Sequence, residues 1–113
     1  MQDLSMQLFE LNQDLTTSVK VLRRNGQKLA EAERDYKVLL RQEVLKLRAE
    51  GMAVTLIDLI IYGVPEVAEL RLKRDIAKTM YEANMEHINS TKLQIRILQN
   101  QIDKEWSSTE QGV

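Results

Sequence analysis

The feature that most constrains this chain is a seven-residue repeat of apolar positions in its first half. One series runs through Leu8, Leu15, Leu22, Leu29 and Tyr36, and a second through Leu4, Leu11, Ser18, Asn25, Ala32 and Leu39. Such a repeat is typical of a helix that packs along a narrow stripe against another helix. It predicts one long helix over residues 3–49. Gly26 is then a helical residue that costs about 1 kcal/mol, and a break at Asn25-Gly26 is the alternative, because this pair is also a turn signal.

The second half repeats the pattern, with Pro65 placed to open a helix. Its two series are Val67, Arg74, Tyr81, Ile88, Ile95 and Ile102, and Leu70, Ala77, Asn84, Thr91, Leu98 and Glu105. We predict a second long helix over residues 65–106, followed by a frayed polar tail at 107–113. Between the two, Gly51 is expected to end the first helix. Thr55 with Asp58 resembles a capping signal for a short connecting helix over 55–62, closed by Gly63.

The two series match each other when the helices run antiparallel. Residues whose numbers add to 109 or 110 then face one another, so that Leu11 meets Leu98 and Leu15 meets Ile95. The expected fold is therefore all-α, an antiparallel coiled-coil helical hairpin with a short connecting helix, in a single domain of residues 1–113. Asn25 falls opposite Asn84 in this register. We interpret them as a polar pair that fixes the register, with a loosely packed or solvated stretch as the alternative.

The simple seam fails near the connector, where Tyr36 would face Arg74 and Glu43 would face Val67. Apolar residues there spread beyond one stripe, and two helices cannot bury all of them. We therefore predict self-association, with a homodimer as the first choice. The candidate interface residues are Leu40, Val44, Leu47, Leu56, Ile57, Ile60, Ile61, Leu72 and Ile76.

Basic residues are unevenly distributed along the chain. Segments 20–48 and 71–78 hold thirteen Lys and Arg against five acids, a net of +8, and the remainder holds three against twelve, a net of −9. This predicts an electropositive connector half that could contact phosphate or an acidic partner. The candidate phosphate contacts are Arg41, Lys46, Arg48, Arg71 and Lys73. The alternative is a solvated face with intrahelical pairs, and the lack of interleaved aromatic residues argues against nucleic acid.

The residues needed for catalysis or metal binding are scarce. The chain has no cysteine and a single histidine, His87, which is expected at an exposed rim position. Glu82 and Glu86 lack the Glu-x-x-His partners of a di-metal bundle, and no glycine-rich phosphate loop is present. We expect no enzyme, no cofactor, no catalytic residue and no metal site. No stretch approaches eighteen apolar residues, so we expect a soluble, cytoplasmic protein without a membrane segment.

Trp106, the single tryptophan, is expected to close the open end of the hairpin, with anchoring of a partner as the alternative. Its position falls opposite the first turn of the first helix in the predicted register.

Several runs resemble a known group of proteins. They are LRAEGM at 47–52, TLI at 55–57, PEVAELR at 65–71, KRD at 73–75, YE at 81–82, LQIRIL at 93–98 and EW at 105–106. Over residues 36–106 the chain resembles small uncharacterised helical proteins of phages and prophages of Gram-positive bacteria, similar to those of early-gene regions near recombination and single-strand-binding functions. The resemblance supplies no catalytic or ligand residues.

Together, the resemblance and the sequence favour a non-catalytic interaction protein of a phage or prophage, located in the cytoplasm of the bacterial host cell. It would bind a phage or host protein, as an accessory to phage DNA replication or recombination or as a modulator of a host factor. A nucleic-acid-binding protein and a structural or assembly spacer are the alternatives. A secreted helical hairpin is disfavoured, because the connector lacks Trp-Xaa-Gly.

Overall fold

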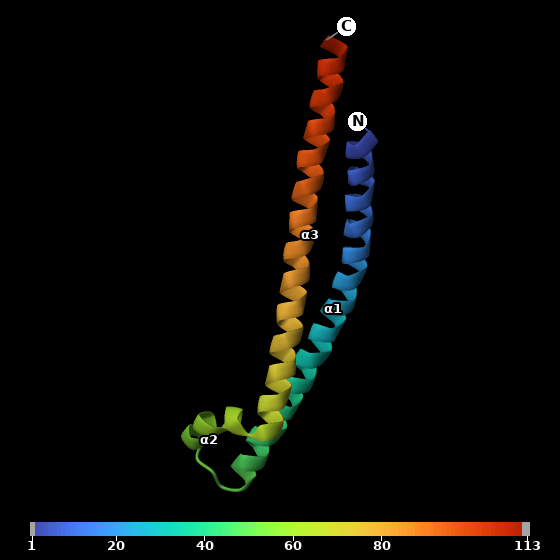
Figure 1. The fold of residues 1–113 in the computed structure, drawn as a ribbon. Coiled ribbons are helices and arrows are strands. Elements are labelled where there is room, and N and C mark those ends of the chain that lie inside the picture. The colour runs from blue at the N-terminus through green and yellow to red at the C-terminus, as the bar shows by residue number, and fades with distance from the viewer. Residues whose placement is uncertain (1, 112–113) are drawn as a thin grey trace. The chain divides into compact units, whose positions relative to one another are not determined.

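The structure is a computed structural model that describes residues 2–111, and it is all-α. Helix α1 spans Gln2–Ala49, α2 spans Val54–Ile60, a 3₁₀ turn η1 spans Ile61–Gly63, and α3 spans Pro65–Gln111 (Figure 1). The two long helices pack together and are joined by the short helix. The predicted all-α helical hairpin with a short connecting helix is confirmed.

Helix α1 runs without interruption through Asn25-Gly26, so the alternative of a break there is wrong. A side chain of one carbon at Gly26 would meet only the Tyr81 ring, with its Cε2 atom 3.5 Å and its Cδ2 atom 3.9 Å away. Both are ordinary van der Waals distances. Glycine at position 26 is therefore not required by a close approach of the two helices.

We expect Gly26→Ala to raise the free energy of unfolding by about 0.5–1 kcal/mol, because alanine loses less backbone entropy than glycine in a helix interior. The measurement is urea denaturation followed by helical circular dichroism. Gly51→Ala is the control and should destabilise, because Gly51 has a φ of +89°, which alanine adopts only with strain. A destabilised Gly26→Ala variant would contradict the account of this position.

The end of α1 is fixed by backbone geometry around Gly51, as predicted. The Gly51 N–H donates to the Arg48 carbonyl at 3.0 Å, and the Met52 N–H donates to the Leu47 carbonyl at 3.1 Å. These two bonds form a Schellman motif, in which the residue after the helix adopts the left-handed conformation. Glycine adopts that conformation without strain, so the chain turns here.

The connector differs from its prediction in both of its ends. Helix α2 begins at Val54 rather than at Thr55, and its N-cap is Ala53, which makes no side-chain cap bond. The N–H groups of Leu56 and Ile57 donate to the Ala53 carbonyl at 3.1 and 3.0 Å, so the backbone alone starts the helix. The predicted capping role of Thr55 is therefore wrong, and the segment predicted to end α2 is the tighter turn η1.

Helix α3 begins at Pro65, as predicted, and extends beyond its predicted end. Proline fits the first helical position because its missing N–H needs no partner there, and the Ala68 N–H donates to the Val64 carbonyl at 2.9 Å. The helix continues to Gln111, five residues past Trp106. Residues 107–111 contain no glycine or proline that would stop a helix, so the predicted frayed tail is helical there. Residues 112 and 113 lie outside the described residues.

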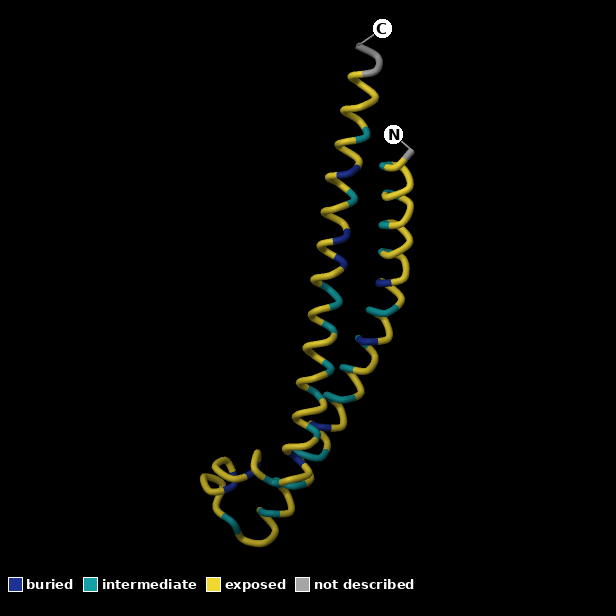
Figure 2. Tube along the Cα trace, in the orientation of Figure 1, coloured by how far each residue is buried: buried dark blue, intermediate teal, exposed yellow. Residues whose placement is uncertain are grey.

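Two units divide the chain, and each is built from parts of both long helices. Unit 1 holds residues 1–23 and 82–113, and unit 2 holds residues 24–81. In unit 1 the buried residues are Ser18, Ile88, Thr91 and Leu98, and in unit 2 they are Asn25, Tyr36, Ile57, Ile61 and Val67. Along α1, the positions of the predicted repeat are buried or half-buried up to Leu39 (Figure 2).

The predicted weak point of the seam is a specific contact in unit 2. Tyr36 is only 6% exposed, and the Arg74 guanidinium lies 4.7 Å from the centre of its ring. Arg74 Nε also donates to Asp75 Oδ1 at 2.7 Å, so the cation is satisfied while it covers the ring. The expected pairing of Tyr36 with Arg74 therefore occurs, but as a cation–π contact rather than as a loosening of the hairpin.

Candidate functional site

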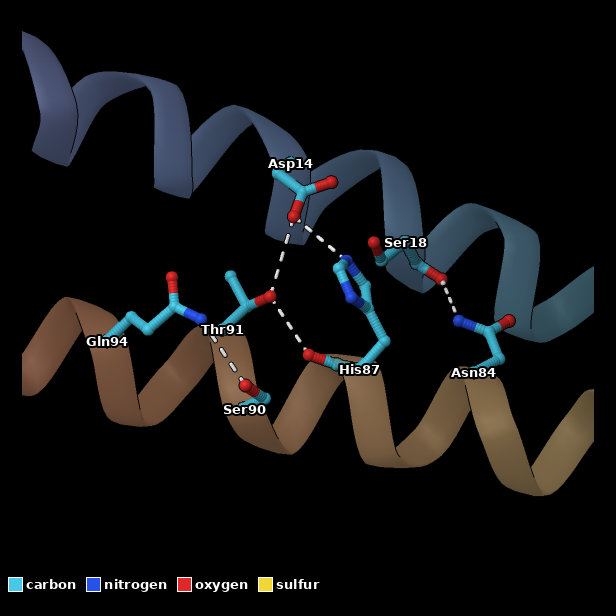
Figure 3. A network of polar contacts seen from close by, with 7 residues as sticks. All are labelled: Asp14, Ser18, Asn84, His87, Ser90, Thr91 and Gln94. Carbon is cyan, nitrogen blue, oxygen red and sulfur yellow. Dashed lines mark hydrogen bonds and ion pairs between the residues drawn. The ribbon is translucent and has the colours of Figure 1, made fainter.

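A polar network links the two helices of unit 1 (Figure 3). Asp14 on α1 receives contacts from two residues of α3: His87 Nε2 lies 2.9 Å from Asp14 Oδ2, and Thr91 Oγ1 lies 3.4 Å from the same oxygen. Thr91 Oγ1 also donates to the His87 carbonyl at 2.9 Å. Thr91 is 2% exposed, so its hydroxyl is enclosed by the helices and divided between these two acceptors.

This network contains the residue types of a hydrolytic triad but not its arrangement. In a triad the imidazole accepts the hydroxyl proton of the nucleophile. Here His87 Nε2 faces the Asp14 carboxylate, and the Thr91 hydroxyl faces a backbone carbonyl and that carboxylate. The arrangement joins α1 to α3 and holds the Thr91 hydroxyl inside the seam.

Sequence reasoning missed Asp14 as the partner of His87. His87 is exposed, as predicted, but its ring contacts Asp14 across the helices. Both residues lie one position before a seam residue, Leu15 and Ile88, and such flanking positions form interhelical pairs in coiled coils. These flanking positions were the sequence signal that could have predicted the contact. The pair is exposed, so its contribution to stability is about 0–1 kcal/mol.

The polar contacts of unit 1 involve residues near those that the predicted register sets opposite each other. The register places Thr91 opposite Ser18, and the Thr91 hydroxyl contacts Asp14, one helical turn before Ser18. Asn84 Nδ2 donates to the Ser18 carbonyl at 3.4 Å. Asn25 is buried, and its role as the register partner of Asn84 stays a prediction.

The candidate interface residues divide into three classes. Ile57 and Ile61 are buried within unit 2, so their prediction as interface residues is wrong. Leu40, Val44 and Leu47 are half-buried, while Leu56, Ile60, Leu72 and Ile76 are exposed. The most exposed apolar side chain of α2 is Leu59, at 82%, which was not in the predicted set.

The exposed apolar residues adjoin shallow grooves. One, of about 750 Å³, is lined by Lys37, Val38, Leu40, Arg41, Val44 and Leu45 on α1. A second lies in unit 1 along Phe9, Asn12, Gln13, Thr16 and Thr17. A third, in unit 2, is lined by Asn25, Lys28, Lys73, Ile76, Ala77 and Met80. These surfaces can receive side chains of another helix, which is the helix-in-groove mode of recognition.

The candidate phosphate contacts Arg41, Lys46, Arg48, Arg71 and Lys73 are all exposed in unit 2. Their surroundings are less basic than predicted, because Glu50, Asp58, Glu66 and Glu69 belong to the same unit. Unit 2 holds eleven Lys and Arg against nine Asp and Glu, a net of +2. Intrahelical pairs also form, with Lys37 Nζ 3.5 Å from Glu33 Oε1. The net positive charge of the connector half is therefore much smaller than the +8 counted over its basic segments.

Trp106 is more than half exposed, so the structure does not show it closing the end of unit 1. The part of the chain that the structure describes contains no group of three or more His, Cys, Asp and Glu side chains placed to hold a metal ion. Within the same described range, no helix combines the length and the apolar character needed to cross a membrane.

Comparison with known proteins found no matching family model, no matching curated protein and no matching solved structure. The resemblance to phage and prophage proteins therefore rests on the sequence runs alone.

Proposed function

We propose that this chain is a non-catalytic, self-associating interaction protein of a phage or prophage, which binds a phage or host protein through exposed apolar side chains of its helices. The observation that carries the proposal is helix α2. Its residues Leu56, Leu59 and Ile60 are exposed, while Ile57 is buried. Exposed apolar side chains that lie next to one another mark candidate interaction sites, so the outward face of α2 supports a partner.

The spacing within α2 defines this outward face. Leu56, Leu59 and Ile60 are three and four residues apart, which places them on one side of a helix. Ile57 and Ile61 are four apart and are buried, so they occupy the other side. Covering apolar surface contributes roughly 25 cal/mol per Å² to the free energy of binding. A bound helix that covers Leu56, Leu59 and Ile60 would therefore be stabilised by this face of α2.

The remaining observations favour this class over its alternatives. The Asp14, His87 and Thr91 network holds its hydroxyl against a carbonyl, which supports a non-catalytic role. Nucleic-acid binding is less favoured, because unit 2 carries a net charge of only +2. A structural spacer gives no reason for Leu59 to be 82% exposed. The specific role, as an accessory to phage DNA replication or recombination or as a modulator of a host factor, is proposed from the resemblance.

The test compares Leu59→Glu with Thr55→Glu, two exposed positions of α2 that receive the same charge. Fluorescence of an apolar dye should fall several-fold for Leu59→Glu and stay unchanged for Thr55→Glu. In affinity capture from lysates of a Gram-positive lysogen, read by quantitative mass spectrometry, a protein that binds the unmodified chain should also bind Thr55→Glu. The same protein should be absent from the capture with Leu59→Glu. Equal behaviour of the two variants in both measurements would overturn the role of the outward face of α2.

A further inference from the structure

We propose that the outward face of α2 in one copy of this chain docks into a basic groove on α1 of a second copy. The basic groove is the one of about 750 Å³ that is lined by Lys37, Val38, Leu40, Arg41, Val44 and Leu45. The groove and the outward face both belong to unit 2. This inference rests on the proposed function, since it names a second copy as a partner of the outward face.

The basic groove offers apolar walls and a cationic rim. Val38 and Leu45 are more than half exposed, and the side chains of Lys37 and Arg41 are exposed beside them. The long stems of lysine and arginine cover apolar surface while their charged ends reach outward. Residues 37–48 hold four Lys and Arg against a single acid. An occupant that combines apolar side chains with carboxylates therefore fits this groove.

The connector has the complementary chemistry. Residues 50–69 hold four acids and no Lys or Arg. Asp58 and Glu69 are exposed, and so is the outward face of α2, where Leu59 is 82% exposed. Because this face is exposed in its own chain, it is not seated in a groove there. The connector is therefore an acidic segment whose apolar side chains are accessible to a second copy.

The groove and the helix also match in length. Helix α2 has seven residues, so it is about 10 Å long at a rise of about 1.5 Å per residue. The groove residues from Lys37 to Leu45 cover about 12 Å of α1 by the same rise. One short helix can therefore occupy the whole groove, in the helix-in-groove mode of recognition.

Charge complementarity selects the connector of a second copy as the occupant. Two basic grooves in contact would oppose cations, and two connectors in contact would oppose carboxylates, and both arrangements are disfavoured. A connector on a groove instead brings Asp58 of one copy to Lys37 and Arg41 of the other. The contact is heterologous, because the two copies use different surfaces. Since these charges are exposed, we expect salt to weaken the association.

The experiment is sedimentation equilibrium on the full chain, up to millimolar concentration. One short helix in a groove makes a small interface, so we expect an association that depends on protein concentration. The measured quantity is the weight-average mass, which rises with concentration for a dimer and for a longer assembly alike.

Two charge-reversed variants test the contact. Variant one is Lys37→Glu with Arg41→Glu, at the groove, and variant two is Asp58→Lys with Glu69→Lys, at the connector. Each alone should associate about tenfold more weakly than the unmodified chain, or weaker still, because one side of its contact has the wrong charge. An equimolar mixture should associate again, because the unmodified connector of variant one docks into the unmodified groove of variant two.

Lys92→Glu with Arg96→Glu is the matched control, because it makes the same charge change over the same four-residue spacing as variant one, at exposed positions of α3. Both positions belong to unit 1 and lie outside the groove and the connector. The control should therefore associate as the unmodified chain does. Helical circular dichroism checks folding, and all substituted residues are exposed.

The outcomes separate this inference from the proposed function. Either variant associating as tightly as the unmodified chain, or a mixture that associates no better than the separate variants, would overturn the contact and leave self-association standing. An unmodified chain that stays monomeric to millimolar concentration would overturn self-association and the contact together. Binding of a phage or host protein through α2 is judged separately by capture with Leu59→Glu.

Discussion

Tyr36→Ala is expected to lower the free energy of unfolding by about 3–5 kcal/mol, the range typical of removing a large buried aromatic side chain. Tyr36 is 6% exposed in unit 2, and the guanidinium of Arg74 lies 4.7 Å from its ring centre. The substitution would remove the ring from the core and leave a half-buried cation without its aromatic partner. Urea denaturation at one fixed protein concentration measures the loss, since the proposed self-association would make stability depend on concentration.

Tyr62→Ala is the matched control for Tyr36→Ala. Tyr62 has its own cation–π contact, with the Arg71 guanidinium 4.9 Å from the ring centre, but the ring is exposed. An exposed contact of this kind contributes about 0.5–1 kcal/mol, so the loss should be several times smaller. Equal losses for the two variants would show that burial of Tyr36 is not what stabilises this part of unit 2.

Ile57→Ala is the second substitution with a large expected effect. Ile57 is 1% exposed, and shortening a buried isoleucine to alanine typically costs about 2–5 kcal/mol, because a cavity remains. We expect the loss to appear as a lower urea midpoint. If the connector were only a tether between the long helices, the midpoint would not change.

Leu59→Ala is the control for Ile57→Ala, because it removes a side chain of equal size from the same helix. Leu59 is 82% exposed, so the free energy of unfolding should change by no more than about 0.5 kcal/mol. The pair therefore distinguishes the inward from the outward face of α2. A large loss for Leu59→Ala would contradict the assignment of the outward face as a binding surface.

The helices themselves could be predicted from the sequence, because the signals for them are local. The repeat of Leu8, Leu15 and Leu22 specifies a helix and the face that it buries. Gly51 and Pro65 mark the end of α1 and the start of α3, since each suits one backbone position. These predictions need no knowledge of which residues lie opposite one another.

The polar contacts across the seam and the fate of individual connector residues could not be predicted in the same way. Successive turns of the seam look alike, so the sequence did not indicate that Asn84 donates to the Ser18 carbonyl. In the connector nearly every residue is apolar, and composition does not distinguish buried Ile57 from exposed Leu56. That difference depends on which side of α2 packs against the rest of unit 2, and this contact is not local in the sequence.

The hairpin topology also imposes an order of events during folding. Asp14 and His87, which contact each other in unit 1, are separated by 73 positions along the chain. Closing such a loop costs entropy that grows with the logarithm of its length, so we expect the residues nearest the connector to pair first. During synthesis the leucine repeat of α1 leaves the ribosome well before α3 exists. For that interval the apolar stripe has no intramolecular partner, and on a polysome the nearest matching stripes belong to neighbouring nascent copies of the same chain.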